Sequence, residues 1–159
     1  MLYETADRAV FFDPLAGEDD AALWSWADER CRGREVVVLE TVVYHRRSRE
    51  QFLARYSAST TAPPTVRGHA FPAADETIYW IAEHRAIVPG DLLIGTGGGA
   101  LALCPESWLE DLSGRPTLAE VREALGVLRD LDADLVLVSH GDPALRDGRA
   151  ALARALDAP

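Results

Sequence analysis

Two polar residues stand where apolar runs end, and they are the first candidates for chemistry. An apolar run reaches Asp91 through a Pro-Gly pair, and apolar residues resume directly after it. His140 closes the apolar run 135–138 after a single serine, and Gly141 lets the backbone turn sharply behind it. Carboxylates and imidazoles presented together at strand ends are suited to binding a metal ion. We therefore expect Asp91 and His140 to share one pocket.

A third candidate is His45, which follows the longest β-like segment, residues 35–43. Together with Asp91 and His140 it would supply the three protein ligands that a catalytic zinc takes, leaving a fourth position open. On this interpretation the three residues hold a metal or a water molecule, and they are the predicted catalytic residues.

The residues around His45 suggest a different use of the same pocket. Arg46 or Arg47 could replace the metal by neutralising a partly buried carboxylate through a charge-assisted hydrogen bond. A pocket of that kind would prefer an anionic small molecule, with both arginines as contacts. Tyr44 could donate a further hydrogen bond, although a buried tyrosine with a bonded hydroxyl is the simpler interpretation.

The leading candidates also have purely structural interpretations. Asp91 can be a turn residue after the Pro-Gly pair, and His140 can be a hydrogen-bonded histidine at a strand end. His84 lies in an expected turn and should be solvated. Cys31 and Cys104 are far apart in the sequence and are expected to be small buried apolar residues.

Composition narrows the class of protein. A chain of 159 residues fits a single domain, here 1–159, that needs no disulfides. The net charge of −10 disfavours nucleic-acid binding, and no apolar run is long enough to cross a membrane. All basic residues are arginines, which excludes lysine-dependent chemistry. The N-terminus lacks the features of a signal peptide, so a cytoplasmic location is expected.

Strand-like and helix-like segments alternate along the chain, which predicts an α/β fold. The expected strands cover 9–12, 35–43, 65–67, 76–82, 86–88 and 135–138. Capping boxes are expected at Ser48 with Gln51 and at Thr117 with Glu120, the second opening a helix that reaches Arg129. The glycines at 97–99 lack the spacing of a phosphate-binding loop and are expected to form a flexible loop.

The order of these segments resembles that of the metallo-β-lactamase superfamily. The similar segments are an apolar strand ending in Asp-Pro at 9–14, the strand 36–41, the hairpin 77–95 ending in Gly-Asp, and the segment 135–156 with its Ser-His-Gly-Asp-Pro turn. The resemblance implies a four-layer αββα sandwich that commonly holds two metals, usually zinc. It also implies that Asp91 corresponds to the bridging aspartate and His140 to the final histidine.

The sequence departs from that superfamily at its other ligands. The HxHxDH motif is replaced by residues 42–48, where only His45 offers a nitrogen, and the Gly-His turn is missing from residues 70–75. A dinuclear site is therefore not expected. The cofactor is predicted to be one divalent metal, zinc first, or none.

Two functions follow from this comparison. The first is hydrolysis of an ester, thioester, lactone or phosphoester by Asp91, His140 and His45. The second is a non-catalytic scaffold that binds a small anion through Arg46 and Arg47 or serves in assembly. The fold is expected to be shortened at its N-terminus, with the exposed sheet edge covered in a homodimer.

Overall fold

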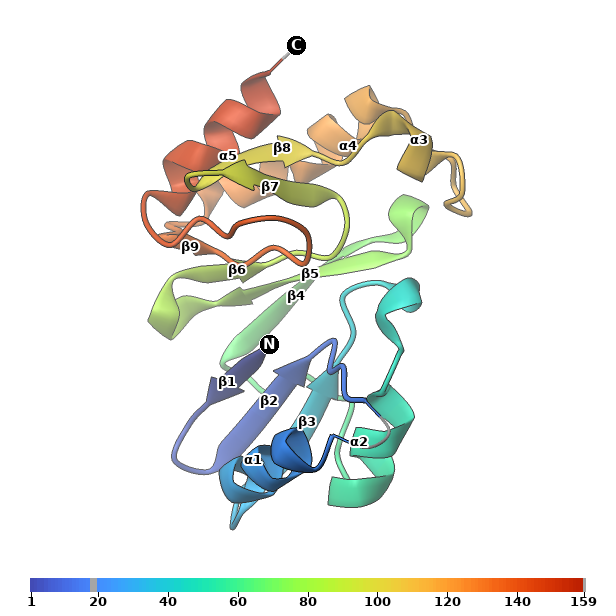
Figure 1. Ribbon diagram of the computed structural model, residues 1–159. Helices are drawn as coiled ribbons and strands as arrows, with labels where there is room; N and C mark the ends of the chain where they lie inside the picture. The colour runs from blue at the N-terminus through green and yellow to red at the C-terminus, as the bar shows by residue number, and fades with distance from the viewer. Residues whose placement is uncertain (18–19, 159) are drawn as a thin grey trace. The chain divides into compact units, whose positions relative to one another are not determined.

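The computed structural model describes residues 1–17 and 20–158. The chain divides into two compact units, Met1–Ala62 and Pro63–Pro159, and Figure 1 shows the elements of each. Each unit has its own β-sheet and its own apolar cluster. In the described part of the chain, no helix is long and apolar enough to cross a membrane.

The N-terminal unit contains a three-stranded sheet in the order β1-β2-β3. Strands β2 and β3 are parallel, and the connection between them passes through helix α1. The expected first strand is β2, and a further strand, β1, precedes it and pairs antiparallel with it. The bounds are β1 Leu2–Glu4, β2 Arg8–Phe12, α1 Ala21–Cys31, β3 Glu35–Leu39, η1 Val43–His45 and α2 Arg49–Tyr56.

Aromatic packing joins the helices of this unit to its sheet. The ring centroids of Phe11 on β2 and Phe52 on α2 lie 4.9 Å apart, and both residues belong to one apolar cluster.

The predicted capping box at Ser48 is wrong, because the Ser48 side chain makes no hydrogen bond to the first turn of α2. The Ser48 hydroxyl instead donates to the Ala16 carbonyl and accepts from the Ala16 N–H.

The C-terminal unit is built on a four-stranded sheet in the order β4-β5-β6-β9. The first three strands are antiparallel, and β9 pairs parallel with β6. Two short 3₁₀ turns, η2 Pro72–Ala74 and η3 Ala82–His84, connect the antiparallel strands. The strand bounds are β4 Val66–Phe71, β5 Glu76–Ile81, β6 Ala86–Val88 and β9 Leu135–Val136.

A second sheet and three helices complete this unit. Strands β7 Leu93–Gly97 and β8 Ala100–Leu103 form an antiparallel hairpin. Of the three glycines expected in a flexible loop, Gly98 and Gly99 form its turn, while Gly97 is the last residue of β7 and pairs with Ala100. Figure 1 shows helix α5, Gly148–Asp157, beside this hairpin, and the two are in contact. The remaining helices are α3 Glu106–Leu109 and α4 Leu118–Leu125.

Helix α4 begins as predicted and ends earlier than predicted. Thr117 and Glu120 form the expected capping box, with both reciprocal bonds present. The α-helix stops at Leu125 and tightens into the 3₁₀ turn η4, Gly126–Asp130, instead of continuing to Arg129. Glycine is a poor helix former, which accounts for the break at this position.

Candidate metal centre

Asp91 and His140 lie in contact within the C-terminal unit. The Asp91 Oδ1 and His140 Nε2 atoms are 3.1 Å apart, and the two side chains are 26% and 43% exposed. Neither residue belongs to a strand, since β6 ends at Val88 and β9 ends at Val136. The parallel pairing of β6 with β9 brings the two following loops to the same edge of the sheet. The expected contact of Asp91 with His140 is therefore present, in the loops that follow the two strands rather than at the strand ends.

Glu76, at the start of β5, fixes the backbone around Asp91. Its carboxylate accepts hydrogen bonds from the backbone N–H groups of Gly90, Asp91 and Leu92, at 2.9, 2.8 and 2.9 Å. Only 3% of this residue is exposed. Burial raises the pKa of Glu76 to about 7, against the three N–H donors, which lower it. The turn that carries Asp91 is thus held by a buried acid.

The loop that carries His140 is held by a close backbone approach. The Gly95 N–H on β7 donates to the His140 carbonyl at 2.8 Å. A Cβ atom on Gly141 would lie 2.0 Å from the Gly95 oxygen, and one on Gly95 would lie 2.0 Å from the Asp142 oxygen. Both positions require glycine, because no side-chain atom fits at such distances.

Trp108 of α3 packs against the His140 ring. The two rings meet edge to face, with centroids 5.2 Å apart and an angle of 67° between their planes. Such aromatic contacts favour a defined ring orientation. The backbone and the ring of His140 are therefore both constrained by neighbouring elements.

His45 has its own supporting residues in the N-terminal unit. Its Nδ1 atom lies 3.0 Å from Asp13 Oδ2. The same carboxylate accepts bonds from the Thr41 N–H at 2.8 Å and from the Thr41 hydroxyl at 2.5 Å. In a neutral histidine, an Nδ1–H that donates to a carboxylate leaves Nε2 unprotonated, which is the form that binds a metal. The contact with Asp13 therefore favours the His45 tautomer whose Nε2 can bind a metal ion.

Replacing Asp13 with asparagine tests this assignment directly. Asp13 has a positive φ of 46°, which asparagine tolerates, so the turn should persist. The Thr41 N–H, which donates to Oδ1, keeps the amide oxygen at that position and leaves the NH₂ facing the ring. Because an NH₂ group cannot accept from Nδ1–H, we expect His45 to change from the Nδ1–H to the Nε2–H tautomer. Two-bond ¹⁵N–¹H NMR of the imidazoles at mildly alkaline pH reports the tautomer. An unchanged His45 spectrum would contradict the assignment, with exposed His84 as the internal reference.

The three residues beside His45 that were predicted to contact a small molecule, Tyr44, Arg46 and Arg47, have different surroundings. The side chain of Tyr44 is exposed, with 58% of its surface accessible, so the interpretation as a buried tyrosine is wrong. The Arg46 guanidinium donates through Nε to both Glu40 oxygens at 3.1 Å, so it already neutralises a carboxylate of its own unit. Arg47 is exposed.

The donor pair of the C-terminal unit fits a divalent cation. Two ligand atoms bound to one tetrahedral zinc at about 2.0–2.1 Å lie about 3.4 Å from each other. The 3.1 Å between Asp91 Oδ1 and His140 Nε2 is close to that spacing, and one oxygen with one nitrogen is a donor set that zinc accepts. The same distance also suits a direct ion pair.

Comparison with solved structures assigns the architecture. The DIM-1 metallo-β-lactamase is 12% identical and aligns over 98% of this chain and 82% of its own, with a TM-score of 0.59. The B3 metallo-β-lactamase BLEG-1 is 13% identical over 89% of this chain and 86% of its own, with a TM-score of 0.61. The fold is that of the metallo-β-lactamases. No protein-family model and no curated protein matches the sequence.

Sequence reasoning alone missed three residues that support the candidate site: Glu76, Gly95 and Trp108. An acid at the start of an apolar strand was the available signal for Glu76, since such a residue needs donors somewhere. Gly95 and Trp108 carry no comparable signal, because their roles depend on contacts with a loop more than 30 positions away along the chain.

Proposed function

We propose that this metallo-β-lactamase-fold protein is a metal-dependent hydrolase with a single-metal centre that includes Asp91 and His140. The observation that carries the proposal is the 3.1 Å approach of the two donor atoms. The backbone of each residue is also held by its own contacts. Glu76 holds the backbone of Asp91, and the close approach of Gly95 and Gly141 holds that of His140. Such rigid support of an acid and an imidazole is typical of functional sites rather than of surface ion pairs.

His45 is the proposed third ligand. Its support is its position after β3, where the superfamily resemblance expects the histidine motif, together with its contact with Asp13. A carboxylate that orients a histidine through Nδ1 raises the basicity of Nε2 and fixes the ring. Three protein ligands leave an open coordination position, as hydrolysis requires.

The residues have separate roles in this proposal. A bound divalent ion would act as a Lewis acid on a carbonyl or phosphoryl oxygen and would acidify water. Asp91 contributes negative charge to the binding site. Glu76 holds the main chain of Asp91 in place through hydrogen bonds. The Trp108 ring restricts rotation of the His140 imidazole. The proposed substrates are esters, thioesters, lactones or phosphoesters.

Elemental analysis of the purified protein tests the proposal. We expect about one equivalent of zinc or another divalent metal per chain, and a lower melting temperature after chelation. Replacing His140 with alanine should reduce the metal content at least about tenfold, because loss of one of three ligands costs far more than a second-shell change. Replacing His84, an exposed histidine, should leave the metal content unchanged.

Wild-type protein that stays metal-free after incubation with zinc, and that melts at the same temperature with and without chelator, would rule out the hydrolase. The direct contact of Asp91 with His140 supports the second candidate for that outcome, a non-catalytic scaffold. In it, the direct contact between Asp91 and His140 is the final state of the site and no metal is needed. Binding of a small anion, with Arg47 as a contact, would then be measured by calorimetry.

A further inference from the structure

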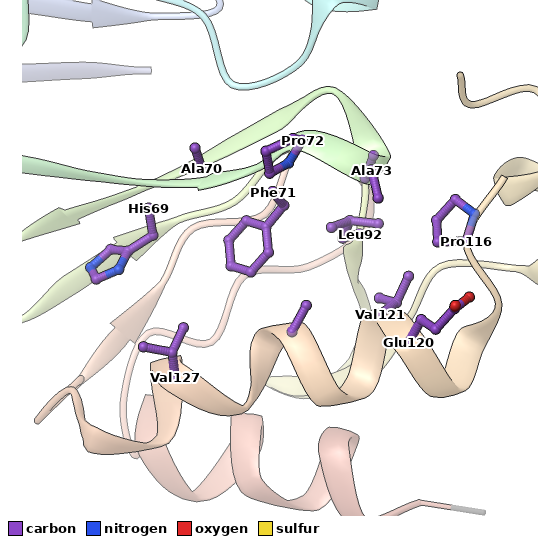
Figure 2. A pocket seen from close by; sticks show the side chains of 12 residues that line it. His69, Ala70, Phe71, Pro72, Ala73, Leu92, Pro116, Glu120, Val121 and Val127 are labelled. Carbon is purple, nitrogen blue, oxygen red and sulfur yellow. The ribbon is translucent and has the colours of Figure 1, made fainter. Parts of the chain in front are cut away.

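An apolar pocket lies between strand β4 and helix α4, within the C-terminal unit. Its volume is about 340 Å³, within the range of small-molecule sites. Figure 2 shows its two walls, with β4 and the turn η2 on one side and α4 with η4 on the other. The lining residues are mostly apolar and include Phe71, Pro72, Leu92, Val121, Ala124 and Val127.

At one end of this pocket, the ring of His69 has a nitrogen atom without a hydrogen-bond partner among the described residues. His69 and Phe71 are two positions apart on β4, so their side chains project from the same face of the strand. Figure 2 shows the His69 ring at the end of the pocket, across from Val127. The His69 Nε2 atom is shielded from solvent and has no hydrogen-bond partner among the described residues. A buried ring nitrogen without a partner is costly, and a ligand that supplied one would remove that cost.

The charges around the pocket restrict what it can accept. Burial, and then the positive charge of Arg67, lower the pKa of His69, which favours the neutral imidazole. The Glu120 carboxylate at the other end is occupied by the capping box, where it accepts from the Thr117 N–H and hydroxyl. Glu120 therefore adds negative charge at this end and offers no hydrogen-bond donor, which disfavours an anion.

We propose that this pocket binds a small uncharged molecule with an apolar ring and one hydroxyl group. The ring occupies the space between Phe71 and Ala124, and the hydroxyl bonds to His69 Nε2. Val127, which is 49% exposed, stands at the open end, where an apolar ligand would cover it. The proposal concerns a site separate from Asp91 and His140, and it holds whether or not the protein binds a metal.

Titration with 4-methylphenol, followed by ¹⁵N–¹H NMR, tests the proposal. We expect saturable shifts centred on β4, α4 and η4. Toluene, which has the ring but no hydroxyl, should bind about three- to tenfold more weakly, the effect of one lost hydrogen bond. The His69→Phe variant should bind 4-methylphenol about as weakly as toluene, while its affinity for toluene stays unchanged.

A second variant tests the location. Ala124→Phe fills the pocket from α4 and should abolish binding of both probes. If this variant does not fold, the His69→Phe comparison and the map of shifted signals still decide the question. Shifts confined to other surfaces, absence of saturation with 4-methylphenol, or equal affinity of the His69→Phe and wild-type proteins for that probe would each overturn the proposal.

Discussion

The Gly141→Ala variant should be less stable than the wild-type protein by roughly 2–5 kcal/mol in free energy of unfolding. Two costs combine at this position. Gly141 has a φ of +79°, where an alanine costs roughly 1–2 kcal/mol. The new Cβ would also lie 2.0 Å from the Gly95 oxygen, so the backbone must separate, at a cost of about 1–3 kcal/mol. Urea denaturation followed by circular dichroism measures the loss.

Two control variants separate these costs. Gly98 also has a positive φ, of 61°, but nothing lies within 4 Å of an added Cβ, so Gly98→Ala should show only the backbone cost. Gly95 has no positive φ but faces the same crowded contact from the other side, so Gly95→Ala should show only the steric cost. If Gly141→Ala were no more destabilising than Gly98→Ala, the close approach would not be structurally important.

Metal affinity at the candidate site should fall only in the variants whose added Cβ separates the two backbones. His140 directly precedes Gly141, and its carbonyl accepts from the Gly95 N–H. Separating the two backbones therefore displaces the imidazole from Asp91. Metal affinity should fall in Gly141→Ala and Gly95→Ala and should remain unchanged in Gly98→Ala, where the hairpin turn alone is altered.

The sequence was most informative at the two apolar runs that precede Asp91 and His140. Asp91 and His140 could be paired before any coordinates, because each followed an apolar run and the order of the runs matched a known superfamily. The capping box at Thr117 was equally predictable, since both of its partners lie within four residues. Local rules suffice where the interaction is local.

The errors have the opposite cause. Ser48 fits the capping pattern, but it bonds instead to Ala16, 32 residues away. Tertiary partners of this kind compete with local ones, and single-sequence patterns do not reveal them. A buried Tyr44 with a bonded hydroxyl is the simpler interpretation of the sequence, yet the 3₁₀ turn η1 leaves its side chain exposed. The donors that hold Glu76 are backbone N–H groups 14 to 16 residues away, which no side-chain pattern encodes.

Glu76 should make the stability of the metal-free protein depend on pH. Its pKa is raised to about 7 in the folded state, from an ordinary 4.5. Between these values the folded protein binds more protons than the unfolded chain, so stability falls as the pH rises. We expect a loss of about 3 kcal/mol across this interval, and none attributable to Glu76 above it. Urea denaturation in the presence of chelator, repeated from pH 4 to 8, measures the trend.

Two substitutions at Glu76 distinguish its charge from its hydrogen bonds. Glu76→Gln removes the titration but keeps an acceptor, so the difference between its curve and that of the wild type should isolate the pH-dependent part. Glu76→Leu leaves three N–H donors without an acceptor, two of them buried, and should lower stability by more than about 3 kcal/mol. The exposed Glu123→Gln on α4 should match the wild-type curve throughout.

The same pair of variants connects stability to the candidate metal centre. If Glu76 acts on Asp91 only through the backbone, Glu76→Gln should retain most of the metal affinity, because two N–H groups can share its remaining oxygen. Glu76→Leu should lose both stability and metal affinity, since the turn from Gly90 to Leu92 is then released. A Glu76→Leu protein that binds metal as tightly as wild type would show that Asp91 is positioned by other contacts.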